Sequence, residues 1–239
     1  MTVWRSIGAS VIGPGHLAAG KPNQDAWVAF HQFWGDGIAV SDGLGSKPFS
    51  DYGSHAACLA VASAAHACHS KTEIGDALLS DLIRDNWLSR IAPLESHDCA
   101  ATCLFAFLMK DGKVRMGLLG DGLVAVVKTD GSVVVLSDDK TQGFSNITAA
   151  LSSSVTEKDW QWLVIPESDC SSIVLCTDGV ADDLADVNGF VTEFADAHRG
   201  LASISAARRV RETLENWPTP KHSDDKTIAC LFREEVADE

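Results

Sequence analysis

Aspartates recur in this chain at the points where apolar segments begin or end. The segments that end on aspartate and glycine are IAVSDG, MGLLGDG and SIVLCTDG, and those that begin after aspartate are NQDAWVAF and SDDKTIACLF. The residues concerned are Asp42, Asp121, Asp178, Asp25 and Asp224. A strand end holds a carboxylate rigidly, and an adjacent glycine lets a carbonyl group or a ligand approach closely. This pattern indicates one oxygen-rich site assembled from several strands.

Carboxylates that converge from different strands repel one another unless protons or a cation relieve their charge. Ligand sets made only of oxygen select hard divalent ions such as Mg²⁺ or Mn²⁺. Two such ions about 3.5–4 Å apart can share a hydroxide and clamp a phosphoryl group. The set as a whole therefore favours metal-dependent phosphoryl chemistry.

A simpler interpretation exists for each aspartate on its own, because Asp-Gly is a strong signal for a hairpin turn. We expect turns at 36–37, 111–112 and 130–131, where the Asp-Gly pairs separate apolar segments. For Asp42 taken alone, a turn and a metal ligand are equally supported.

Strands and helices are expected in separate blocks along the chain. Segments 3–13, 25–33 and 37–43 are predicted to form strands, 50–70 and 73–91 helices, and 99–137 an antiparallel meander. A polar loop, a strand ending at Asp178, a helical region over 188–217 and a last strand follow. Segregated blocks predict an α+β fold, an antiparallel β-sandwich of two sheets flanked by helices. With no linker or repeat, residues 1–239 are expected to form a single domain.

Composition excludes several classes of function. The net charge of −14 disfavours nucleic acid and anionic membranes as partners. No apolar run of about twenty residues occurs, and the N-terminus has no signal-peptide pattern. The seven cysteines include no CxxC pair and no Cys-x5-Arg loop. They are expected to be buried thiols in a reducing compartment, which indicates a cytoplasmic protein without a cysteine nucleophile.

Six motifs occur in the order typical of one enzyme family. They are GxxHxxxGKPNQDAW, AVSDGLGS, ATCLFAFL, LLGDGLVAVV, VLCTDGVADDL and SDDKTIACLF, and together they extend over nearly the whole chain. With these motifs the chain resembles the PPM-type, or type 2C, metal-dependent serine/threonine protein phosphatases in a compact, bacterial-like form. The resemblance implies a β-sandwich flanked by helices and a phosphorylated protein as substrate.

The same resemblance implies roles for the aspartates. Asp42 would bridge two Mg²⁺ or Mn²⁺ ions, and the Gly43 carbonyl would bind one of them. Asp178 and Asp224 would hold the first ion, whereas Asp25 would belong to the second, directly or through water.

Two further positions follow from the motifs. Asp121 corresponds to a residue that, in bacterial members, helps to hold a third and weaker ion together with the Asp178 position. Thr102 would line the site.

The chain departs from the family pattern at the phosphate-binding end. Gln24 stands where many members have glutamate, and Gly20 stands where many have the arginine that holds the substrate phosphate. Lys21 is adjacent but lacks the guanidinium fork. His16 could bind phosphate or act as an acid, or it could only satisfy a turn. Asp225 replaces the usual asparagine and could support the ligands or only precede the last strand.

The implied reaction is hydrolysis of phosphoserine or phosphothreonine by a hydroxide that bridges the two ions. Two alternatives stay open: an inactive family member that acts as a binding module, and a phosphatase for small molecules. The aromatic pair Trp160 and Trp162 could stack on a base, although packing is the simpler interpretation. Residues 139–160 are where a flap beside the site, and hence substrate choice, would lie. The sequence identifies neither the physiological substrate nor a cognate kinase.

Overall fold

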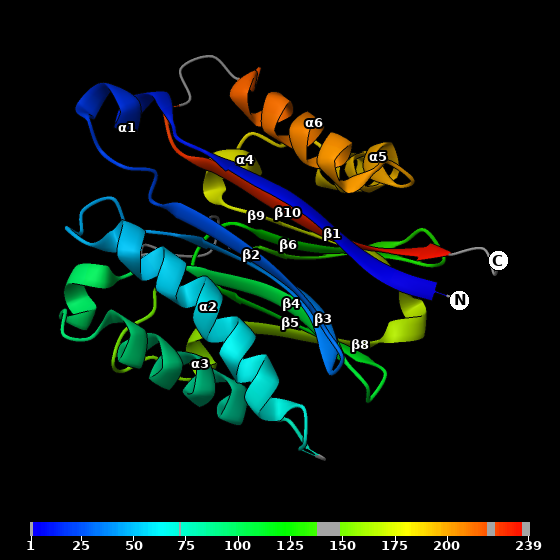
Figure 1. Cartoon of the computed structure of the whole chain (residues 1–239), viewed down its shortest axis with the longest axis horizontal. Coiled ribbons are helices and arrows are strands. Elements are labelled where there is room, and N and C mark those ends of the chain that lie inside the picture. The colour runs from blue at the N-terminus through cyan, green and yellow to red at the C-terminus, as the bar shows by residue number, and fades with distance from the viewer. Residues whose placement is uncertain (1, 72, 138–148, 219–222, 236–239) are drawn as a thin grey trace.

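Two antiparallel sheets of five strands each lie face to face at the centre of the molecule (Figure 1). The computed structural model describes residues 2–71, 73–137, 149–218 and 223–235. The first sheet has the order β1-β10-β9-β6-β7 and the second β2-β3-β4-β5-β8. The strands are β1 (Thr2–Val11), β2 (Asp25–Gln32), β3 (Gly35–Asp42), β4 (Cys103–Met109), β5 (Lys113–Leu119), β6 (Leu123–Lys128), β7 (Val133–Ser137), β8 (Gln161–Pro166), β9 (Cys170–Cys176) and β10 (Lys226–Glu235).

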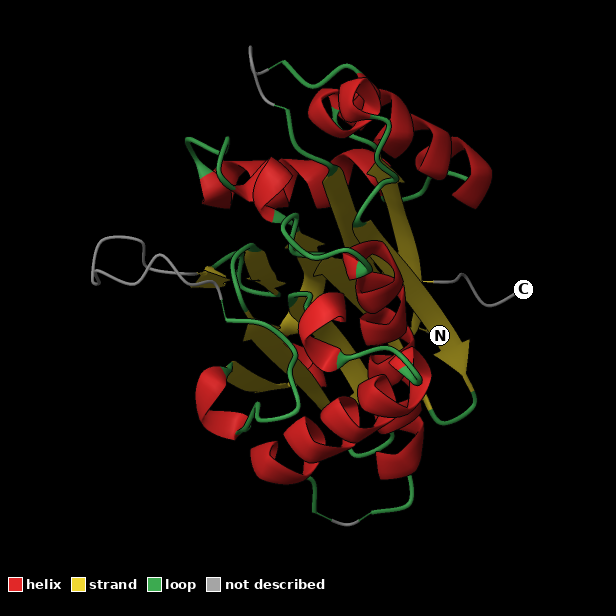
Figure 2. Cartoon of the chain, turned by 90° about the vertical axis from the view of Figure 1, so that its left-hand side faces the viewer, coloured by secondary structure: helices red, strands yellow, loops and turns green. Residues whose placement is uncertain are grey.

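Helices cover the outer face of each sheet, which gives four layers (Figures 1 and 2). Helices α2 (Ser50–Cys68) and α3 (Asp76–Ile91) pack on the second sheet, and α5 (Val187–His198) and α6 (Ser203–Glu215) pack on the first. The short helices α1 (Pro14–Ala19) and α4 (Asp178–Ala181) lie at one end of the sandwich. The predicted α+β sandwich flanked by helices is therefore confirmed.

The central strands are continuously apolar because both of their faces are buried. In β9, Ile173 and Leu175 contact the other sheet, whereas Val174 and Cys176 pack beneath the outer helices. A strand buried on both sides loses the alternation of polar and apolar residues that marks a half-exposed strand.

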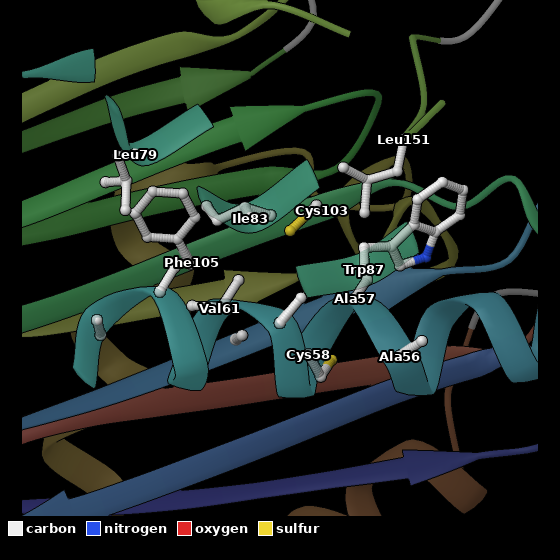
Figure 3. Packing of buried hydrophobic residues seen from close by; sticks show 14 of the residues in the cluster. Ala56, Ala57, Cys58, Val61, Leu79, Ile83, Trp87, Cys103, Phe105 and Leu151 are labelled. Atoms are coloured by element: carbon white, nitrogen blue, oxygen red, sulfur yellow. The ribbon is translucent and has the colours of Figure 1, made fainter. Parts of the chain in front are cut away.

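Helix α2 lies very close to its sheet because the face that it buries consists of small residues. Ala57 and Val61 point toward Phe105 of β4 and Trp87 of α3 (Figure 3). A Cβ atom at Gly53 would lie 1.8 Å from the carbonyl oxygen of Cys99 in the turn before β4, so only glycine lets the helix contact that turn so closely. The alanine-rich composition of residues 50–68 thus determines the spacing between helix and sheet.

One of the three predicted hairpin turns is wrong. The pairs at 111–112 and 130–131 lie in turns, but Asp36 and Gly37 belong to β3. The turn consists of residues 33–34, because Gln32 pairs with Gly35. Trp34 is buried against Phe30, and Asp36 lies opposite His31 with 2.7 Å between Oδ1 and Nδ1. Burial of the tryptophan and this cross-strand pair fix the observed register.

Short elements were missed by periodicity. The sequence pattern does not reveal α1, α4 or β8, which have 6, 4 and 6 residues. The helical region predicted over 188–217 is two helices, α5 and α6. Of the expected flap, residues 139–148 lie outside the described residues. Trp160 and Trp162 stack on each other and pack against Phe105, so the packing interpretation holds.

The cysteines are unpaired and buried. Burial raises the pKa of these thiols, to about 12 for Cys170. A thiol that stays protonated is a poor nucleophile. In the described part of the chain, none of the helices combines the length and apolar character that a bilayer crossing requires.

Candidate active site

The predicted site residues lie where strand ends from both sheets meet, at the left-hand end of Figure 1. Asp25 begins β2 and Asp42 ends β3, and the antiparallel register places them directly opposite each other. Asp178 follows β9 as the first residue of α4. Asp224 precedes β10, the strand paired with β9. Residues distant in sequence thus reach one end of the sandwich.

Asp121 is brought into this group by two glycines. Gly120 and Gly122 have φ angles of 98° and 116°, which side chains with a Cβ atom rarely adopt. They reverse the chain between β5 and β6. As a result, one carboxylate oxygen each from Asp42, Asp121 and Asp178 lies within 4.8 Å of the other two. Among the described residues, these three aspartates are the acidic, histidine or cysteine side chains that lie close enough together, as a group of three, to hold a metal ion.

Asp25, Asp42 and Asp178 lie in an environment that resists their ionisation. Burial, followed by the charges of Asp25 and Asp178, raises the pKa of Asp42 well above its ordinary value. Burial raises the pKa of Asp25 to about 7, although hydrogen bonds from two threonines oppose the shift. Burial and the charges of Asp121 and Asp224 raise the pKa of Asp178 to about 6. A positive ion at this position would relieve the repulsion.

The donor set fits a hard divalent cation. Its members are carboxylates only, as Mg²⁺ and Mn²⁺ prefer. The neighbouring Gln24 adds a buried oxygen, Oε1, that has no hydrogen-bond partner among the described residues, while its Nε2 donates to Ser50 Oγ at 2.7 Å. Asp42, Asp121 and Asp178 would hold an ion.

Two threonines position the opposed aspartates. Thr177 Oγ1 donates to Asp25 Oδ2 at 2.8 Å and accepts from the backbone N–H of Thr227 at 3.1 Å. Thr102 Oγ1 accepts from the backbone N–H of Asp42 at 2.8 Å. Thr102 was predicted from the resemblance. Thr177 was not singled out, although its position directly before Asp178 in the TDG motif was a usable signal.

Replacing Thr177 with valine should weaken metal binding. The change leaves Asp25 Oδ2 and the Thr227 N–H without this partner, which costs about 1–3 kcal/mol of folding stability. Loss of a residue that orients a ligand typically lowers metal affinity about 10-fold or more. Calorimetric Mn²⁺ titration measures this, and Thr177→Ser is the control that should restore affinity. Equal affinity in the valine variant and the native protein would refute the positioning role.

Asp225 is a buried anchor for the connection between β1 and β2. Its Oδ1 accepts from Gly13 N–H at 2.6 Å, and its Oδ2 accepts from Gln24 N–H at 2.6 Å. His16 Nδ1 lies 2.8 Å from the same Oδ2. A Cβ at Gly13 would lie 2.2 Å from the carbonyl carbon of Asp224, so the two segments touch. Asp225 therefore supports the site and does more than precede the last strand.

The remaining predicted residues have defined positions beside this centre. The N–H of Gly43 donates to the Gln24 carbonyl at 3.0 Å, which links the ends of β2 and β3. Lys21 is exposed, and its Nζ donates to the Gly45 carbonyl at 3.2 Å. His16 belongs to α1 and is oriented by Asp225. The catalytic roles of Lys21 and His16 remain predictions.

Comparison with known proteins identifies the family. Residues 12–217 match the sequence model described as protein phosphatase 2C. The chain belongs to the protein phosphatase 2C family. No curated protein sequence matches it significantly.

Solved structures share the protein phosphatase 2C fold with this chain. The photosystem II phosphatase PBCP has a TM-score of 0.67 at 16% identity, with 98% of this chain and 100% of that chain covered. The catalytic domain of the serine threonine protein phosphatase PstP, in complex with two manganese ions, has a TM-score of 0.62 at 16% identity, with 98% and 100% covered. RsbX, in complex with magnesium, has a TM-score of 0.62 at 14% identity, with 97% and 96% covered. At these identities the likeness establishes the fold.

Proposed function

We propose that this protein hydrolyses phosphoserine and phosphothreonine in proteins with the help of two Mg²⁺ or Mn²⁺ ions and, at Asp121, a third. The observation that carries the proposal is the convergence of Asp42, Asp121 and Asp178 oxygens within 4.8 Å in an environment that raises carboxylate pKa values. Family membership and the metal ions named for PstP and RsbX agree with it.

The carboxylates supply the charge and rigidity that this chemistry needs. Bound divalent ions would lower the pKa of a coordinated water and offset charge on the phosphoryl oxygens. Asp42 would lie between the ions, opposite Asp25, and the Gly43 carbonyl would add a ligand. Asp178 and Asp224 would complete the set. Strand ends and threonine hydrogen bonds keep these groups in place, so little reorganisation is required during the reaction.

The substrate phosphate and leaving group would be served by the segment before β2. His16, oriented by Asp225, would donate a proton to the leaving alkoxide, and Lys21 would offset phosphate charge. Lysine presents a point charge and no planar fork, so phosphate binding here should be weaker than with arginine. The seven buried free thiols support a reducing compartment, the cytoplasm.

Comparison of substrates with and without metal tests the proposal. With Mn²⁺, phosphoserine and phosphothreonine peptides should be hydrolysed at least about tenfold more efficiently, in kcat/KM, than nucleotides or sugar phosphates. Activity should vanish on chelation and return when Mn²⁺ is added. A preference for small esters would indicate a small-molecule phosphatase. Absence of metal-dependent turnover, with metal binding and fold intact, would indicate a binding module instead.

A further inference from the structure

A cavity of about 770 Å³ lies between helix α6, strand β1 and the first residue of β10. Arg211 contributes from α6, Ser10 from β1 and Lys226 from β10. None of the five aspartates predicted to bind metal lines it. Its volume falls within the range of small-molecule sites in proteins, about 300–1,000 Å³.

The charged residues in the lining, Lys226, Arg211 and Glu215, give the cavity a net charge of +1, although the chain carries a net charge of −14. Lys226 is only 4% exposed, and its Nζ donates to the Asp224 carbonyl at 3.0 Å. In the described ranges, no carboxylate lies within ion-pair distance of this ammonium. Arg211 has neither a hydrogen-bond nor an ion-pair partner among the residues that the structure describes. Glu215 is the one carboxylate in the lining.

A buried ammonium without a carboxylate partner is unusual, because removing a charge from water is costly unless an opposite charge compensates it. An anion placed between Lys226 and Arg211 would supply that compensation. Arg211 can present two parallel N–H groups to a carboxylate or phosphate. The amide of Asn23 is a further polar group in the lining.

The other walls are apolar. Val11, Ile12, Leu214 and the indole of Trp217 line the cavity. A second cavity of about 430 Å³ adjoins it, since Ser10 and Arg211 line both. Arg211 therefore lies between the two cavities, beside β1. A ligand that fits has one anionic group and an apolar body.

We propose that this cavity binds a small organic anion, a carboxylate or phosphate attached to an aromatic or aliphatic body. The site is separate from the metal centre but linked to it. Lys226 holds the carbonyl of Asp224, and Asn23 Oδ1 accepts from the backbone N–H of Asp25 at 3.0 Å. A bound anion would thus contact Lys226 and Asn23, whose hydrogen bonds hold the backbone of the predicted metal ligands Asp224 and Asp25. Binding itself does not depend on phosphatase activity.

The test uses 2-naphthoate as probe and its uncharged isostere 2-naphthamide as reference, with inorganic phosphate in a third arm. Calorimetric titration of the intact chain should show naphthoate binding at least about tenfold more tightly than naphthamide. Arg211→Gln should weaken naphthoate binding about tenfold and leave naphthamide binding unchanged. Arg209→Gln is the matched control. It removes the same charge from α6, but Arg209 lines neither cavity.

A spectroscopic measurement places the probe. The indole ring C–H resonances of Trp217, which lines the cavity, should shift on titration with naphthoate, whereas those of Trp87, buried in another cluster, should not. If the native protein binds inorganic phosphate and the Arg211→Gln variant does not, the result would support an anion subsite for a phosphorylated ligand. Equal affinity for naphthoate and naphthamide, the same loss in both arginine variants, or unshifted Trp217 resonances would overturn the proposal. None of these outcomes depends on turnover, so they are distinguishable from failure of the proposed function.

Discussion

Asp42→Asn is expected to abolish metal-dependent phosphatase activity. Asp42 is the residue that pairs with Asp25 across the ladder and shares the carboxylate cluster with Asp121 and Asp178. Asparagine keeps the shape but removes the charge and one anionic oxygen from the centre of the ligand set. Metal ions contribute several kcal/mol to such reactions, so kcat/KM should fall by about 10³ or more.

The same substitution should stabilise the protein when metal is absent. Desolvation raises the pKa of the partly buried Asp42, and repulsion from Asp25, Asp178 and Asp224 adds to the shift. Removing its charge relieves that repulsion, so at pH 8 the Tm of the metal-free variant should exceed that of the native protein. Loss of activity with a gain in Tm separates damage to the site from damage to the fold.

Asp36→Asn is the matched control for this variant. Asp36 lies in the same strand, six residues earlier, and its carboxylate pairs with His31 outside the cluster. Activity and Mn²⁺ affinity should therefore stay near their native values. Retention of metal-dependent turnover in Asp42→Asn would contradict the proposed mechanism.

The second large effect is an expected loss of stability of the metal-free protein as the pH rises, which bound Mn²⁺ should reverse. Asp25 and Asp178 have pKa values raised to about 7 and about 6 by burial and by neighbouring charge. In the unfolded chain an aspartate titrates near 4. The folded state consequently holds more protons than the unfolded state between about pH 4 and pH 7. The contribution of these groups to stability is present below pH 4 and is lost as the pH rises through 6 and 7.

Metal-free protein should therefore become less stable from pH 5 to pH 8. One pKa unit corresponds to about 1.4 kcal/mol, so several kcal/mol are at stake. Mn²⁺ replaces these protons and should stabilise the protein far more at pH 8 than at pH 5. Denaturant unfolding at each pH, with and without Mn²⁺, measures both effects.

A variant tests whether the aspartate cluster, and not the rest of the protein, causes this pH dependence. Asp178→Asn should flatten the pH dependence of the metal-free protein and reduce the stabilisation by Mn²⁺ at pH 8. The lowered pKa values of Asp111 and Glu234, each hydrogen-bonded by an arginine, act in the opposite direction but only below their ordinary pKa values. A native protein that gains stability between pH 5 and pH 8 without metal would refute the electrostatic description.

Sequence patterns were sufficient for the long elements. The apolar run of β9 reflects burial of the strand on both faces, and the alanine-rich sequence of α2 reflects close packing of the helix on the sheet. Both features are visible in the composition of a short segment. The turn at 33–34 was not predictable in the same way. Asp-Gly is a strong local signal, but burial of Trp34 and the pair between His31 and Asp36 outweighed it. Short helices such as α1 offer too few residues for a period to be recognised.

The sequence by itself predicted the chemical type of the site, because the strand-end aspartates stand in motifs whose order resembles one family of metal-dependent phosphatases. It also determined the sandwich through the blocks of strands and helices. Only the tertiary structure decided which carboxylates meet, how strongly burial raises their pKa values, and that Asp225 and Thr177 hold neighbouring segments in place. The cavity beside Lys226 and Arg211 likewise arises from three distant segments. Distances and desolvation depend on packing between residues far apart in the chain, which no local pattern encodes.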